Sequence, residues 1–211
     1  MTTDDRLSRL GPLSGVLFVA LQLGGVAIGS QPMATIGDPE SKILNAISDH
    51  AGTAAWAGAY MELASFAAFA LFAAWLFRSR RGPLATAGLL AAGVYVAISV
   101  SALVVGDVLK YGANHAMGDQ QMLALFDVQS GFYFASWGIA AGFLALVPVT
   151  GWLRRSAVAI AALLLIAMAA PTADPAQIPN MLFLIWAVVA GIVLARRPHT
   201  VTGRAPAAAQ A

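Results

Sequence analysis

One acidic residue, Glu62, interrupts a long apolar stretch of this sequence, AYMELASFAAFALFAAWLF. It lies eight residues after Ala54, where the apolar run begins, and no basic residue follows before Arg78. A carboxyl group about 12 Å along an apolar helix can bind a proton, a cation or the polar part of a ligand. It can also join two helices as a neutral hydrogen-bonding group. Both alternatives place Glu62 inside a bundle.

Small residues flank Glu62 at helical spacing. Gly58 precedes it by four positions and Ser65 follows it by three, so this face of the helix is expected to pack closely against another helix. An inward-facing acid in a medium of low dielectric constant avoids an unpaired charge by binding a proton or a cationic partner. We therefore expect Glu62 to be protonated at neutral pH unless water or a ligand cation reaches it.

Polar residues on other apolar stretches are expected at a similar depth. The predicted ligand or proton site consists of Glu62 and five further residues, which are Gln22, Ser65, Ser99, Asp127 and Ser130. If these side chains converge, they form a small polar cavity in the outer half of the bundle. Gln22 can instead have a structural role, as a hydrogen-bonding group between packed helices. Asp127 lies near enough to the end of its span to be a solvated carboxylate.

Two histidines beside acidic residues are weak candidates for a metal site. Asp49 with His50, and His115 with Asp119, offer imidazole and carboxylate ligands of the kind that zinc accepts. The alternative is that Asp49 caps a helix and both histidines are solvated. The absence of cysteine excludes thiolate sites and disulfides, and no nucleotide-binding or hydrolase motif occurs. We expect no cofactor and favour a non-enzymatic protein.

The composition predicts that these residues lie in a membrane protein. The chain of 211 residues is 59% hydrophobic and only 10% charged, and its mean hydropathy is +0.76. A spanning helix requires about 20 mainly apolar residues. Six stretches meet or approach this length: 12–29, 54–77, 83–106, 123–149, 156–170 and 180–195.

Basic residues predict the orientation of the six spans. If the spans alternate, ten of the twelve lysines and arginines fall on one side, and only Lys42 and Lys110 fall on the other. By the positive-inside rule both termini are then cytoplasmic. The sequence predicts an all-α, six-transmembrane-helix bundle in the bacterial inner membrane. With a net charge of +2 and no basic patch, no nucleic-acid partner is expected.

The connecting segments carry little further structure. Within 31–53, the stretch SKILNAISDH has apolar residues at helical spacing and predicts a short amphipathic helix in the first outer loop. The polar stretch LKYGANHAMGDQQ is predicted to be a surface loop. Residues 1–197 form the predicted transmembrane domain, and 198–211 a disordered cytoplasmic tail.

The first 80 or so residues resemble a group of small bacterial membrane proteins without an assigned activity. The resemblance rests on the first helix, GVLFVALQLGGVAIG, on a loop ending in Asp49 and His50, and on a second helix containing Ala59 and Tyr60. Members often carry arginine after the histidine, where this chain has Ala51. The resemblance implies a six-helix inner-membrane protein and transfers no activity.

Three functions fit these observations. The first is binding of a small apolar or lipid-like ligand, and the second is service as an accessory subunit of a larger membrane complex. The third is proton- or cation-coupled transport, which depends on Glu62. The expected partners are membrane lipids, with other membrane subunits in the second case.

Overall fold

The computed structural model describes residues 3–29, 34–49, 51–170 and 177–196, and its regular elements are α-helices. In chain order they are α1 (Thr3–Ala27), α2 (Glu40–Asp49), α3 (Thr53–Phe77), α4 (Pro83–Asn114), α5 (Asp119–Leu146), α6 (Gly151–Ala169) and α7 (Ile178–Arg196). The predicted tail, 198–211, lies outside the described residues.

Five of these helices are long and apolar enough to cross a membrane. They are the Leu10–Ala27 part of α1 together with α3, α4, α6 and α7. The described residues are all-helical, as predicted, and five helices have the length and composition that a multi-pass membrane protein requires. The remaining long helix, α5, carries Asp119, Asp127 and several glutamines, which lower its hydropathy.

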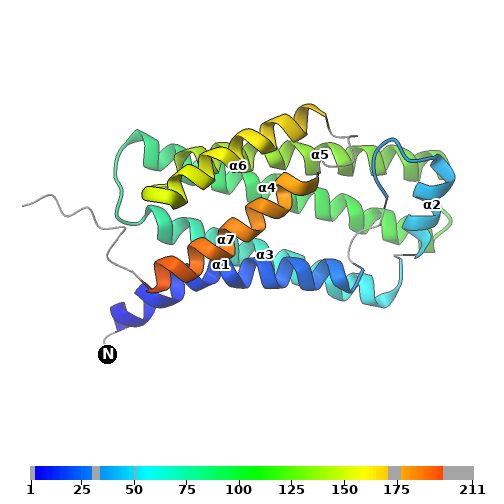
Figure 1. The fold of residues 1–211 in the computed structure, drawn as a ribbon. Helices are drawn as coiled ribbons and strands as arrows, with labels where there is room; N and C mark the ends of the chain where they lie inside the picture. Colours follow the sequence, from blue (N-terminus) through cyan, green and yellow to red (C-terminus); the bar gives the residue numbers. More distant parts are fainter. Residues whose placement is uncertain (1–2, 30–33, 50, 171–176, 197–211) are drawn as a thin grey trace, which may run out of the picture.

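The six long helices form an elongated bundle (Figure 1). α1 packs along α3, α4 packs along α5, α7 covers α1 and α6 covers α5. One end of the bundle, here called the arginine end, is defined by the described arginines that follow α3 and that lie in α6 and at the end of α7: Arg78, Arg80, Arg81, Arg154, Arg155 and Arg196. The opposite end is covered by α2 and is here called the α2 end (Figure 1).

Interlocking aromatic rings form the core. The ring of Phe69, which is fully buried, lies 5.1 Å from the Phe18 ring, 5.1 Å from the Phe143 ring and 6.1 Å from the Phe183 ring. Centroid separations of this size are typical of favourable aromatic pairs. These four rings come from α1, α3, α5 and α7, so they fix the relative positions of four helices.

The predicted amphipathic helix is confirmed as α2. Ile43 and Ile47 are buried against Leu109, Met122 and Phe126 of α4 and α5, while the polar side of α2 remains exposed. α2 therefore caps the bundle rather than standing free of it.

The prediction of a surface loop at LKYGANHAMGDQQ is wrong for most of the stretch. α4 continues to Asn114 and α5 begins at Asp119. A helix of 32 residues is about 48 Å long at ~1.5 Å per residue, whereas the hydrocarbon layer is about 30 Å thick. The polar residues therefore extend α4, which contacts α2, instead of ending it.

Lys110, expected in that loop, is instead buried in α4. Its side chain is only 3% exposed, and its Nζ lies 2.8 Å from a carboxylate oxygen of Asp107. The same ammonium group lies 5.8 Å from the centre of the Trp56 ring. The helical spacing of three residues brings Asp107 and Lys110 to one face, which allows the charged nitrogen to be buried.

Candidate functional site

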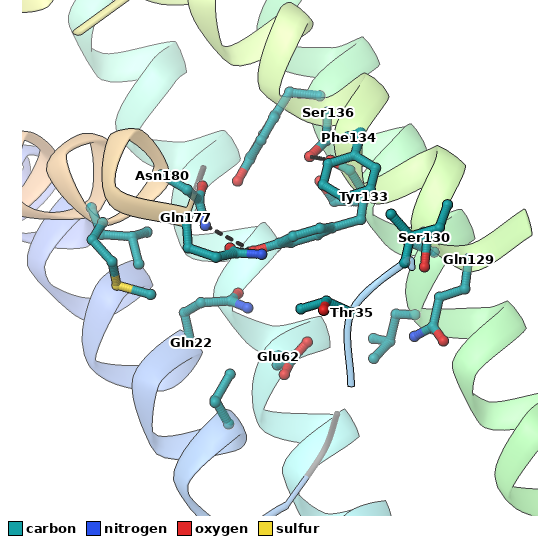
Figure 2. Close-up of a pocket in the computed structure, with 18 of the residues that line it drawn as sticks. Gln22, Thr35, Glu62, Gln129, Ser130, Tyr133, Phe134, Ser136, Gln177 and Asn180 are labelled. Carbon is teal, nitrogen blue, oxygen red and sulfur yellow. Dashed lines mark hydrogen bonds between the residues drawn. The ribbon is translucent and has the colours of Figure 1, made fainter. Parts of the chain in front are cut away.

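A cavity of about 520 Å³ lies between the aromatic core and the α2 cap. Its walls come from α1, α3, α4, α5 and α7, and the segment 34–36 contributes at the α2 end. Most of the lining surface is apolar, with a few polar side chains among aromatic rings (Figure 2). This size and composition are typical of sites for small organic ligands.

Glu62 is part of the cavity wall, and its predicted inward orientation is confirmed. The residue is 3% exposed, and Figure 2 shows its carboxyl group among the side chains that surround the cavity. Gly58 and Ser65 share its buried face, while Tyr60 and Leu63 are exposed on the opposite side of α3. Helical periodicity alone accounts for this division.

A glycine on α1 makes room for Glu62. A Cβ atom at Gly25 would lie 2.8 Å from Cγ of Glu62 and 2.8 Å from the carbonyl oxygen of Gly58. Both distances are shorter than ordinary van der Waals contact, so only glycine permits α1 to approach α3 this closely. This close approach places α1 against the acidic side chain.

Gln22 and Ser65, two residues of the predicted site, meet across the α1–α3 interface. The Ser65 hydroxyl lies 2.8 Å from Oε1 of Gln22 and 2.6 Å from the carbonyl oxygen of Glu62. Gln22 lines the cavity, whereas Ser65 is fully buried behind it. Ser65 thus positions Gln22 and ties it to the turn of α3 that carries the acid.

Ser99 of α4 and Ser130 of α5 also line the cavity with Glu62. Asp127 does not, and its predicted place in the site is wrong. The side chain is exposed on the outer face of α5, whereas Phe126 and Ser130 face inward. Asp127 is rotated by about 100° from the buried Phe126 around the axis of α5, since a helix has 3.6 residues per turn, and this rotation exposes its side chain.

A hydrogen-bonded bridge between α5 and α7 forms part of the cavity wall. The Tyr133 hydroxyl donates to Oε1 of Gln177 at 3.2 Å and accepts from Nδ2 of Asn180 at 3.0 Å. All three residues line the cavity, and Figure 2 shows them across it from Glu62 and Gln22. The bridge connects α5 with the start of α7 at the α2 half of the bundle.

The described walls combine one acidic group with aromatic rings and neutral polar side chains. Among the described residues that line the cavity, Glu62 is the one with a carboxyl group, and lysine, arginine and histidine are absent. Both lysines of the chain are held elsewhere, Lys110 by Asp107 and Lys42 by Asp38, each at 2.8 Å. Five aromatic residues complete the lining: Phe66, Tyr95, Phe126, Tyr133 and Phe134.

The metal candidates are not brought together in the described part of the chain. Within it, no group of three or more histidine and acidic side chains could hold a metal ion. His115 lies with its Nδ1 2.8 Å from the carbonyl oxygen of Tyr111 and its ring stacked on the Tyr111 ring at 3.9 Å. Asp49 and Asp119 are exposed, and His50 lies outside the described residues.

Several lining residues were absent from the predicted site although the sequence carried a signal for them. Gln129, Tyr133 and Ser136 line the cavity from α5 at spacings of four and three residues, which is the repeat of one helical face. Gln129 in turn depends on Gly106 of α4, where a Cβ atom would lie 2.5 Å from its Nε2. Polar residues repeating on one face of an apolar helix were the available signal.

Comparison with known proteins finds no matching family model, no matching curated protein and no matching solved structure.

Proposed function

We propose that this chain is a multi-pass protein of the bacterial inner membrane that binds a small, mainly apolar or lipid-like ligand in the cavity beside Glu62. The observation that carries the proposal is the cavity itself, about 520 Å³ in volume and walled by five helices. A ligand that partitions into the bilayer is the natural occupant, because the lining is mainly apolar with a few polar groups to orient it.

In this proposal α5 is a sixth span. α4 ends at the α2 end and α6 begins at the arginine end, so α5 has to traverse the same thickness that its neighbours cross (Figure 1). Its 28 residues cover about 42 Å at ~1.5 Å per residue. The polar residues on its inner face line the cavity and do not contact lipid.

The charge distribution supports cytoplasmic termini. The described arginines that follow spans gather at the arginine end, while Lys42 and Lys110 lie at the α2 end in pairs with Asp38 and Asp107. The positive-inside rule assigns the arginine end to the cytoplasm. The cavity then lies in the outer half of the membrane.

The test is saturable binding of a neutral apolar probe, 1-pyrenemethanol, to the full chain in dodecyl maltoside micelles. Energy transfer from tryptophan reports binding, because Trp137 is buried with its ring 5.4 Å from that of the cavity residue Tyr133. We expect one site per chain. Ala102 lines the cavity, so Ala102→Phe should weaken binding at least about tenfold, which corresponds to ~1.4 kcal/mol.

Ala97→Phe is the matched control, since Ala97 is exposed on the same helix and does not line the cavity. The control variant should bind as the wild type does. Equal binding by both variants, or energy transfer no greater than in micelles with an unrelated tryptophan-containing membrane protein, would refute the proposal.

Coupled transport is a second candidate, favoured by the position of the Glu62 carboxyl group in the cavity wall. It requires pH-dependent flux into proteoliposomes that Glu62→Gln abolishes. Binding without flux would refute coupled transport and would leave ligand binding as the proposed function.

A further inference from the structure

We infer that the ligand is a lipophilic organic cation, an amine or ammonium compound with apolar substituents, whose charged nitrogen lies beside Glu62. This inference rests on the proposed ligand-binding function and specifies the chemical class of the ligand. It follows from three features: the acidic group in the described lining of the cavity, the pairing of both lysines with other acids, and the aromatic walls.

The first feature is the electrostatic sign of the site. Glu62 is 3% exposed and lines the cavity, in a medium where charge interactions are weakly screened. A cation beside the carboxylate is stabilised there, whereas an anion would be repelled. A fatty acid or the phosphate of a lipid headgroup would find no cationic side chain among the described lining residues.

The second feature is that both lysines, which lie in this half of the bundle, already have acidic partners. Lys110 Nζ lies 2.8 Å from Asp107, and Lys42 Nζ lies 2.8 Å from Asp38. The described arginines lie at the other end of the bundle. Both lysines are therefore neutralised by aspartates that do not line the cavity.

The third feature is the aromatic lining. Phe66 and Tyr95 line the cavity from α3 and α4, and their rings are 6.3 Å apart in an edge-on arrangement. Tyr133 and Phe134 line it from α5, opposite Glu62 in Figure 2. Aromatic faces attract organic cations, most strongly where water is excluded. Together with one carboxylate, they provide charge and contact for a bulky ammonium group.

Two ions that match in size and shape but differ in the sign of charge test this inference. Tetraphenylphosphonium and tetraphenylborate each carry four phenyl groups on a central atom. We would measure how each displaces 1-pyrenemethanol from the full chain in uncharged dodecyl maltoside micelles, with protein-free micelles as the partition control. We expect the cation to displace the probe at a concentration at least about tenfold lower than the anion.

Variants of Glu62 test whether its carboxyl group causes the preference for the cation over the anion. Glu62→Gln should weaken tetraphenylphosphonium binding at least about tenfold more than it weakens 1-pyrenemethanol binding, which is measured in the same variant. Glu62→Asp keeps the carboxylate and should retain the preference for the cation. Asp127→Asn is the matched control, because Asp127 is exposed outside the cavity, and it should leave both ions unaffected.

The two proposals fail in distinguishable ways. Binding of 1-pyrenemethanol with equal displacement by the two ions, or stronger displacement by the borate, overturns the cation inference and leaves ligand binding intact. A preference for the cation that survives in Glu62→Gln also overturns it, because the charge then has another source. If 1-pyrenemethanol does not bind to the wild type, the proposed function fails and the inference fails with it.

Discussion

Replacing Gly25 with alanine is expected to destabilise the packing of α1 against α3. The added Cβ atom would lie 2.8 Å from the carbonyl oxygen of Gly58, whereas ordinary contact begins at 3.4 Å. The obstacle is backbone, which cannot rotate away as a side chain can. The two helices must therefore separate locally by about 0.6 Å, or tilt, to accept one methyl group.

Two opposing contributions set the change in stability that Gly25→Ala causes. Alanine is intrinsically better than glycine in a helix by about 0.5–1 kcal/mol, and overpacking a well-packed contact costs about 1–3 kcal/mol. Gly93→Ala is the control, because Gly93 is exposed on α4 and a Cβ atom there meets nothing within 4 Å. Relative to this control, Gly25→Ala should be less stable by about 1–3 kcal/mol.

Equilibrium unfolding measures the difference in unfolding free energy between Gly25→Ala and Gly93→Ala. Both variants are unfolded in mixed micelles of dodecyl maltoside and dodecyl sulfate, and tryptophan fluorescence follows the transition. The same displacement should move Glu62 relative to Gln22, so 1-pyrenemethanol binding should also weaken in Gly25→Ala and remain unchanged in Gly93→Ala. If Gly25→Ala is as stable as Gly93→Ala, the proposed close contact between α1 and α3 is wrong.

Two further perturbations test the core and the cap. Phe69→Ala removes a fully buried ring and should lower the free energy of unfolding by about 3–5 kcal/mol. The control, Phe132→Ala on an exposed face of α5, should lower it by less than about 1 kcal/mol. Comparable losses for the two variants in the same unfolding assay would contradict the assigned core. At the start of the cap, hydrogen bonds from Lys42 and Thr35 lower the pKa of Asp38 below its ordinary value. Because the unfolded cap binds this proton more readily, the stabilisation is present above the ordinary carboxyl pKa of about 4 and is lost as the pH falls through the lower folded-state pKa. Hydrogen exchange of α2, corrected for the intrinsic pH dependence, should show this loss in the wild type and not in Asp38→Asn.

Local patterns were sufficient to predict most of the helices. The amphipathic repeat of SKILNAISDH predicted α2, because an apolar stripe of that spacing has to be covered. The spacing of Gly58, Glu62 and Ser65 likewise predicted which face of α3 is buried. The error at the end of α4 arose because polarity was taken to mean a loop, although a helix longer than the hydrocarbon layer has a polar end.

The cavity could be predicted only in part. Gln22, Glu62, Ser99 and Ser130 were expected to converge on the basis of depth, and all four line it. Depth along a helix does not specify rotation about its axis, which is why Asp127 was included although it does not line the cavity. For the same reason Gln129, Tyr133 and Ser136 of α5, which do line it, were not included.

The sequence by itself determined that the chain forms apolar helices long enough to cross a membrane, that basic residues cluster between them, and that one acid is buried. Each follows from hydrophobicity and helical periodicity, which are properties of neighbouring residues. Only the tertiary structure decided that α1, α3, α4, α5 and α7 surround a cavity. It also decided that Tyr133 bridges to Gln177 and Asn180, and that Lys110 of α4 is buried beside the Trp56 ring of α3. Those arrangements depend on the rotation, length and close approach of helices distant in sequence, which no local pattern fixes.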